Sequence, residues 1–201
     1  DKIEKMRDTL RLFDETATRP DYARKLLLIE NNIFGVDIQP VAVQIAKLRF
    51  FISLVVEQNA RDDIRPLPNL ETNFVAANTL IGIAKPTDTL FADDPQVAAI
   101  ERDLKANRHR HFFARTTRTK LACRKEDKRL CDELAKALES SGECTPYDSK
   151  RLAGWNPYGT NTHAPFFDPG WMFGLASKNH DGVFDVVIGN PPYVRQEELK
   201  N

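Results

Sequence analysis

An α/β fold with a parallel sheet is predicted by two features of the sequence. Short runs rich in branched and aromatic residues occur at 32–38, 73–76 and 183–188, and helical patterns separate each run from the next. The segment after Gln39-Pro40 repeats apolar residues at the spacing of one helix face, namely Val41, Ile45, Leu48, Ile52 and Val55. Because such a face needs an apolar neighbour, we expect it to pack on the sheet.

Two further helices are expected ahead of the first strand. Apolar residues recur at helical spacing from Ile3 to Phe13, and 22–31 shows a second helical pattern after the break at Arg19-Pro20. The helix that follows the first strand is expected to begin at Pro40, since proline fits a first helical turn. Residues 1–84 therefore form the first part of the predicted core.

A long insertion, 85–182, separates the second and third predicted strands. Helical patterns at 94–105 and 127–140 indicate a helical hairpin, with Leu130, Leu134 and Leu138 on one face. The remainder, 142–182, is rich in proline, glycine and large aromatic residues, which is typical of an ordered loop packed by its own rings. Residues 183–201 are predicted to belong to the same core as residues 1–84.

Composition restricts the class of protein. No apolar stretch is long enough to span a bilayer and no signal peptide opens the chain, so a cytoplasmic protein without membrane contact is expected. The three cysteines are spaced for neither a disulfide framework nor a zinc site. His109 and His111 are interpreted as surface histidines, and no metal site is expected.

The formal net charge is zero, so total charge gives no argument for nucleic-acid binding. Charge is nevertheless unevenly distributed, because 104–125 contains eight cationic residues and no acidic one. This basic segment either neutralises DNA phosphates or forms a solvated helix face. For DNA contact, we expect it on the same side of the molecule as the strand ends at Asp37 and Asn190, and the candidate residues are Arg108, Arg110, Arg115, Arg118 and Lys120.

The last predicted strand runs directly into a stiff polar and aromatic loop, Asn190-Pro191-Pro192-Tyr193. Sites of α/β proteins lie at strand ends. The prolines fix the backbone, so the Asn190 side-chain oxygen and the neighbouring carbonyl can present two rigid acceptors to an amino group. Tyr193 offers a flat face for stacking of a planar base or amide.

This loop resembles the catalytic motif of the amino-methylating DNA methyltransferases, which it reproduces residue for residue. The upstream segment, Ile33-Phe34-Gly35-Val36-Asp37-Ile38-Gln39-Pro40, is similar to the family's second strand. The resemblance implies that Asp37, with Ile38 beside it, binds the ribose of S-adenosylmethionine. Phe74-Val75-Ala76-Ala77-Asn78-Thr79-Leu80 is similar to the third motif and implies that Asn78 contacts the cofactor adenine.

The aromatic stretch from Trp155 to Gly174 resembles the segment that precedes the catalytic loop in type IIG restriction-modification enzymes. The resemblance implies a partial Rossmann-like methyltransferase sheet with a long helical insertion. Because the family's Gly-rich cofactor motif is absent from these residues, we expect a fragment, inactive alone. The rest of the parent polypeptide would supply that motif, a target-recognition domain and any nuclease domain.

The implied activity is transfer of a methyl group from S-adenosylmethionine to the N6 atom of an adenine flipped out of double-stranded DNA. Asn190 and the Pro191 carbonyl would hold the amino group and Tyr193 would stack on the base, while Pro192 stiffens the loop. Two alternatives stay open. One is an N5-glutamine protein methyltransferase, which uses the same loop on an amide. The other is a non-catalytic DNA-binding or scaffold module.

Overall fold

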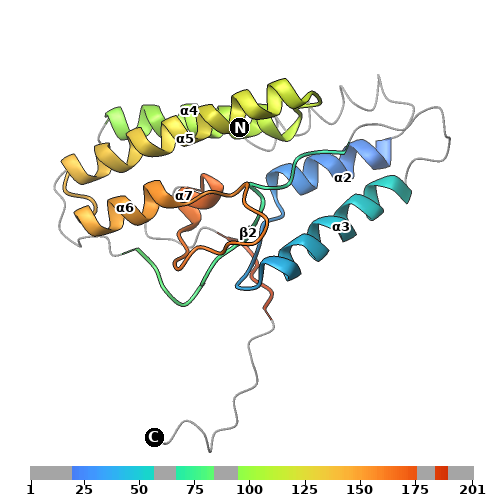
Figure 1. Ribbon diagram of the computed structural model, residues 1–201. Helices are drawn as coiled ribbons and strands as arrows, with labels where there is room; N and C mark the ends of the chain where they lie inside the picture. The colour runs from blue at the N-terminus through green and yellow to red at the C-terminus, as the bar shows by residue number, and fades with distance from the viewer. Residues whose placement is uncertain (1–19, 57–66, 84–94, 176–183, 190–201) are drawn as a thin grey trace, which may run out of the picture.

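A computed structural model describes residues 20–56, 67–83, 95–175 and 184–189. Two helices flank the first strand, α2 (Pro20–Asn31) and α3 (Pro40–Val56), and the strands are β1 (Gly35–Asp37) and β2 (Phe74–Ala76). The described part of the insertion supplies four more helices, α4 (Pro95–Phe112), α5 (Thr117–Ser140), α6 (Pro146–Gly154) and α7 (Pro169–Phe173). Figure 1 shows α2 and α3 on one side of β2 and the insertion helices on the other.

The two strands form a parallel pair, as the α/β prediction requires. Gly35 aligns with Phe74 and Asp37 with Ala76. A Cβ atom on Gly35 would lie 2.5 Å from the Phe74 ring, so glycine permits this close approach. The third predicted strand is not observed, because 184–189 is irregular in the described residues. A strand needs a neighbour for its backbone groups, and the described sheet contains only β1 and β2.

Helix α3 begins at Pro40 as predicted, but the prediction of its buried face is wrong. The apolar stripe is 46% to 66% exposed at each of its positions, Val41, Ile45, Leu48, Ile52 and Val55. The helix instead packs on both strands with the face that carries Val43 and Leu54. Phe50 contacts the Phe74 ring at a centroid distance of 4.6 Å. The described sheet is therefore too narrow to cover the stripe.

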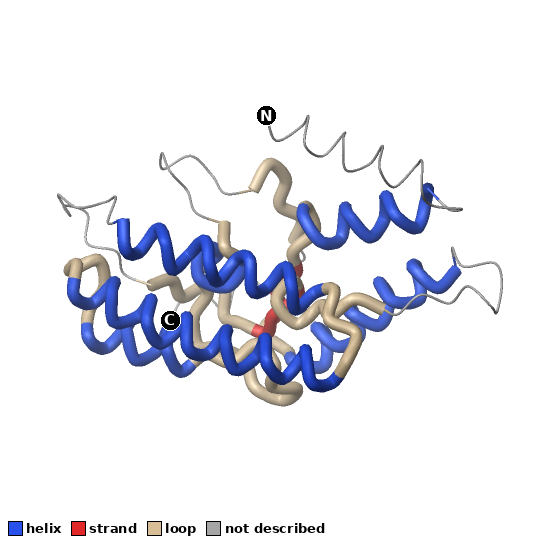
Figure 2. The backbone as a smooth tube through the Cα atoms, turned by 90° about the horizontal axis from the view of Figure 1, so that it is seen from above, coloured by secondary structure: helices blue, strands red, loops and turns tan. Residues whose placement is uncertain are grey.

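The predicted helical hairpin is confirmed, with longer helices than expected. Only residues 113–116 separate α4 from α5, which lie side by side (Figure 2). The Thr116 hydroxyl caps α5 by accepting a hydrogen bond from the Thr119 amide at 3.1 Å. The basic segment is thus almost wholly helical, because arginine, lysine and alanine favour helix and nothing in 117–126 interrupts it.

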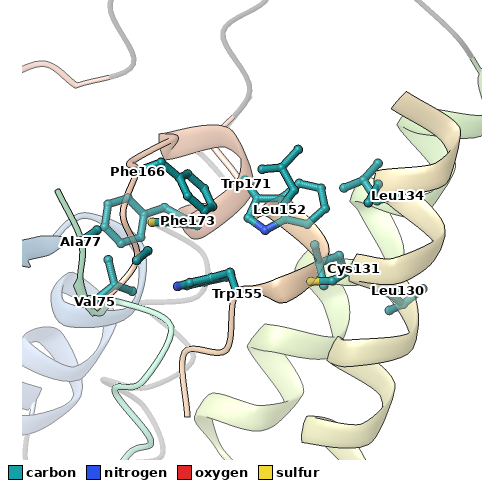
Figure 3. Packing of buried hydrophobic residues seen from close by; sticks show 14 of the residues in the cluster. Val75, Ala77, Leu130, Cys131, Leu134, Leu152, Trp155, Phe166, Trp171 and Phe173 are labelled. Carbon is teal, nitrogen blue, oxygen red and sulfur yellow. The ribbon is translucent and has the colours of Figure 1, made fainter. Parts of the chain in front are cut away.

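The aromatic segment packs as expected, although part of it is helical. Thr145 caps α6, Asp168 caps α7, and Gly174 ends α7 in the left-handed conformation with φ of 67°. Rings of this segment lie between α5 and β2 (Figure 3), and the buried set comprises Trp155, Phe166, Trp171 and Phe173. All three cysteines are buried free thiols, in agreement with the sequence interpretation.

Within the described ranges, no helix is long and apolar enough to cross a membrane. The same part of the chain holds no cluster of histidine, cysteine and acidic residues suited to a metal ion.

Candidate functional site

The candidate cofactor residues Asp37 and Asn78 lie beside each other at the carboxyl ends of the two strands. The Ala77 amide donates a hydrogen bond to the Asp37 carbonyl oxygen at 2.9 Å, and Asn78 is the next residue. The Asn78 amide in turn donates to the Ala164 carbonyl oxygen at 3.0 Å. Parallel strands thus bring together two polar residues that are 41 positions apart in sequence.

Each of these side chains uses one oxygen to hold its own loop. Asp37 Oδ1 accepts from the Gln39 amide at 2.7 Å, and Asn78 Oδ1 accepts from the Leu80 amide at 3.0 Å. Within the described residues, Asp37 Oδ2 and Asn78 Nδ2 make no hydrogen bond. Asp37 is exposed and Ile38 is 53% exposed. The strand ends therefore present one free acceptor and one free donor to solvent.

The predicted catalytic residues, Asn190, Pro191, Pro192 and Tyr193, lie outside the described residues. The segment that leads to them is anchored by Phe184. Its ring lies 6.3 Å from that of Phe34, which directly precedes β1, and 6.4 Å from that of Phe173. Val186, Val187 and Ile188 are 75% to 93% exposed. The segment that leads to Asn190 therefore begins beside the start of β1.

Arg108 is not available for the predicted contact with DNA. It is 6% exposed, and its Nε atom donates to Asp127 Oδ1 at 2.9 Å. Its Nη1 atom donates to the carbonyl oxygens of Trp171 at 2.7 Å and Met172 at 3.2 Å. The guanidinium ties α4 to α5 and to α7, since a buried charge must be paired.

The other cationic candidates lie at the opposite end of the strands from Asp37. Arg110, Arg115 and Arg118 are exposed and Lys120 is half-buried. The turn between α4 and α5 is held by Asn69, which precedes β2 and whose Nδ2 atom donates to the carbonyl oxygens of His111 at 2.8 Å and Ala114 at 2.9 Å. The expectation that the basic segment shares a side with the Asp37 strand end is therefore wrong.

One of the two histidines also differs from its interpretation as a surface residue. His109 is exposed and pairs with Glu30, whereas His111 is 0% exposed. Neither ring nitrogen of His111 has a hydrogen-bond partner in the described part of the chain, and burial lowers the pKa of the imidazole. Its ring lies 5.1 Å from that of Tyr158, so the residue belongs to the packing of α4 against the aromatic segment.

The sequence of 31–201 matches the family model described as Eco57I restriction-modification methylase. The chain belongs to this family. The match includes both strands, the insertion and the Asn190-to-Tyr193 loop of the Eco57I-family chain. It follows that the chain carries a restriction-modification methyltransferase domain, or a large part of one.

A curated relative supports the same assignment. The Eco57I-family chain is 34% identical over 97 residues to a putative type II restriction enzyme and methyltransferase of Methanocaldococcus jannaschii. The alignment covers 44% of this chain and 8% of the relative, so the chain spans a small part of that protein's length. No solved structure matches the chain.

Proposed function

We propose that the chain forms part of an adenine-N6 DNA methyltransferase that uses S-adenosylmethionine and belongs to a larger restriction-modification enzyme. The observation that carries the proposal is the pairing of Asp37 and Asn78 at adjacent strand ends, each with an unused polar atom. It occurs in a chain of the restriction-modification methylase family that also contains Asn-Pro-Pro-Tyr after 184–189. These features support a cofactor site next to a catalytic loop.

The unused acceptor and the unused donor at the strand ends can form hydrogen bonds with the adenosine part of the cofactor. A carboxylate accepts hydrogen bonds from ribose hydroxyls, and Asp37 Oδ2 is the unused acceptor. Asn78 Oδ1 is occupied by the Leu80 amide, so its free Nδ2 would donate to a ring nitrogen of adenine. Ile38, which is 53% exposed, offers apolar surface beside the ring. When bound, the cofactor supplies a methyl group on a sulfonium centre.

The catalytic loop would act by positioning the target amino group. Two acceptors, the Asn190 side-chain oxygen and the Pro191 carbonyl, would bind its two N–H groups and direct the nitrogen lone pair away from the loop. The adenine lone pair is normally delocalised into the ring, so this orientation raises its nucleophilicity. Tyr193 would stack on the flipped base, and Pro191 and Pro192 would keep the acceptors rigid. This mechanism requires no covalent enzyme intermediate.

The uncovered surfaces around β1 support a larger Rossmann-like core in the full-length protein. Gly35 and Asp37 pair with the β2 side, so the backbone groups of Val36 point to the other edge. No strand covers that edge within the described residues. The apolar stripe of α3 and the apolar residues 186–188 are exposed as well. We assign this edge to a parallel strand and helix of the same polypeptide, which carry the Gly-rich cofactor motif.

The class of acceptor tests the proposed function. Full-length enzyme, supplied with radiolabelled S-adenosylmethionine, is expected to label duplex DNA and to leave a glutamine-containing peptide unlabelled. Label on the peptide instead of the DNA would support an N5-glutamine methyltransferase and overturn the proposal. Absence of both transfer and cofactor binding would leave a scaffold module as the correct description.

Replacement of Asp37 by alanine in the full-length enzyme is expected to weaken cofactor binding by about tenfold or more, since a charged acceptor is removed. DNA affinity should stay nearly constant, because Asp37 faces the cofactor in this proposal. Asp37→Asn is the informative companion, since it keeps an acceptor for the Gln39 amide but loses the charge. Exposed Asp103 on α4 provides the matched control, Asp103→Ala.

Isothermal titration with S-adenosylmethionine measures the first effect, and fluorescence anisotropy with duplex DNA measures the second. Wild-type cofactor affinity in Asp37→Asn would assign a purely structural role to Asp37. Equal losses of cofactor and DNA affinity in Asp37→Ala would lead to the same conclusion.

A further inference from the structure

A second polar site lies away from Asp37, between α3 and the insertion. Two adjoining clefts, about 400 and 520 Å³ in volume, separate α3 from the segment 154–166. The larger cleft is also bordered by the turn before β2 and by the first turns of α5. Lys47 of α3 lines both clefts. Since the turn before β2 marks the amino end of the strand, the larger cleft is at the opposite end from the proposed cofactor site, whereas the smaller cleft extends to Pro40, Ala76 and Ala164.

Lys47 is a buried cation with no direct partner among the described residues. The residue is 8% exposed, although it lines a cleft large enough for a ligand. Within the described ranges, its ammonium makes neither a hydrogen bond nor an ion pair. Burial lowers its pKa, while the negative charge of Glu71 across the cleft opposes this shift. A buried ammonium in this state gains from any anion that enters the cleft.

The opposite wall of the larger cleft holds two more cations. Lys120 and Arg124 are one helical turn apart on α5 and both line the larger cleft. Arg124 Nη2 donates to Glu71 Oε1 at 3.1 Å, but the buried Nε atom has no partner among the residues that the structure describes. The guanidinium lies 4.9 Å from the ring centroid of Tyr158, which also lines the larger cleft.

The charges and hydrogen-bonding groups of the larger cleft favour an anionic ligand. Among the described residues that line the larger cleft, three are cations and one, Glu71, is a carboxylate. Glu71 is paired with Arg124 through one oxygen, and its buried second oxygen has no partner in the same part of the chain. Unused donors therefore outnumber unused acceptors, and positive charge is in excess. A phosphate group has several acceptor oxygens and a negative charge, so it would both pair with the unused donors and neutralise the excess positive charge. The cleft volume also admits a nucleoside attached to the phosphate.

We propose that the cleft between Lys47 of α3 and the Lys120–Arg124 face of α5 binds a phosphate group, carried either by the DNA backbone or by a free nucleotide. The inference that this phosphate belongs to DNA rests on the proposed function, whereas the inference that the cleft binds a phosphate does not. The site is separate from the strand ends that carry Asp37, so a phosphate bound here does not occupy the cofactor position.

The test compares Lys47→Met with Lys120→Met and Lys136→Met in the full-length protein. Methionine preserves an unbranched stem and removes only the charge. Lys120 is half-buried, so its replacement tests the cleft without disturbing the core. Exposed Lys136 is the matched control, because it lies 16 residues further along α5, about 24 Å away at 1.5 Å per residue. Thermal unfolding checks that each variant folds.

Titration calorimetry with inorganic pyrophosphate is expected to show affinity about tenfold or more weaker for Lys47→Met and Lys120→Met, and unchanged affinity for Lys136→Met. Anisotropy with duplex DNA at several salt concentrations identifies the source. A DNA phosphate predicts that each variant lowers the slope of log affinity against log salt by about 0.9, whereas a nucleotide predicts an unchanged slope and weaker binding of ADP.

Pyrophosphate affinity equal to wild type in both cleft variants would overturn the proposal, as would failure of the wild-type protein to bind pyrophosphate. Asn190→Ala separates this result from the fate of the proposed function. That variant should bind pyrophosphate normally whether or not it transfers methyl groups, because it leaves the cleft cations Lys47, Lys120 and Arg124 unchanged.

Discussion

Replacement of Asn190 by alanine in the full-length enzyme is expected to lower the rate of methyl transfer by about 100- to 1000-fold. The side chain would supply one of two rigid acceptors for the target amino group, and alanine removes it. Cofactor affinity and thermal stability should change little, because the proposed cofactor contacts are made by Asp37 and Asn78. Single-turnover measurements of methyl transfer, with titration calorimetry for the cofactor, separate these effects.

Companion variants distinguish acceptor chemistry from general disruption of the loop. Asn190→Asp should be milder than alanine, since a carboxylate still offers an acceptor oxygen. Tyr193→Phe keeps the stacking face and should be mild, whereas Tyr193→Ala should be severe. A normal rate in Asn190→Ala would contradict the proposed mechanism directly.

Replacement of Arg108 by methionine is expected to destabilise the fold by about 3–5 kcal/mol, because Asp127 would remain as a buried charge without its cation. Asp127 is 2% exposed, so water cannot compensate for the lost guanidinium. The carbonyl oxygens of Trp171 and Met172 would lose their donor as well. Urea denaturation provides the free energy of unfolding.

Two comparisons make the Arg108 result specific. Arg110→Met, on the exposed side of the same helix, should change stability by less than about 0.5 kcal/mol. The double variant Arg108→Met, Asp127→Leu should recover much of the loss, since no buried charge remains. A stable Arg108→Met protein with weakened DNA binding would restore the earlier interpretation of Arg108 as a DNA contact.

Local patterns in the sequence predicted features that interactions within short segments determine, such as helix starts and helix faces. Pro40 correctly marked the start of α3, and the leucines of 130–138 indicated a hairpin helix. The family resemblance implied cofactor roles for Asp37 and Asn78, and the structure places both residues at the carboxyl ends of adjacent parallel strands. These features depend on turn chemistry, helical spacing and strand direction, all of which short segments encode.

The errors arose where distant segments decide the outcome. The α3 stripe is strongly apolar, yet the described sheet contacts the opposite helix face, on which Lys47 follows Val43 by one turn. Likewise, Arg108 is indistinguishable in sequence from its exposed neighbour Arg110, and only the packing of Asp127 and α7 determines its burial. A cation on a helix's inner face, as at Lys47 and Arg108, is the sequence signal that was missed.

The most direct test of the central claim is identification of the methylated nucleoside. Duplex DNA is incubated with S-adenosylmethionine and the full-length enzyme, digested to nucleosides and analysed by mass spectrometry, with Asn190→Ala as the matched control. We expect N6-methyladenine with the wild-type enzyme and almost none with the variant. Methylation of cytosine, or equal N6-methyladenine from both proteins, would contradict it.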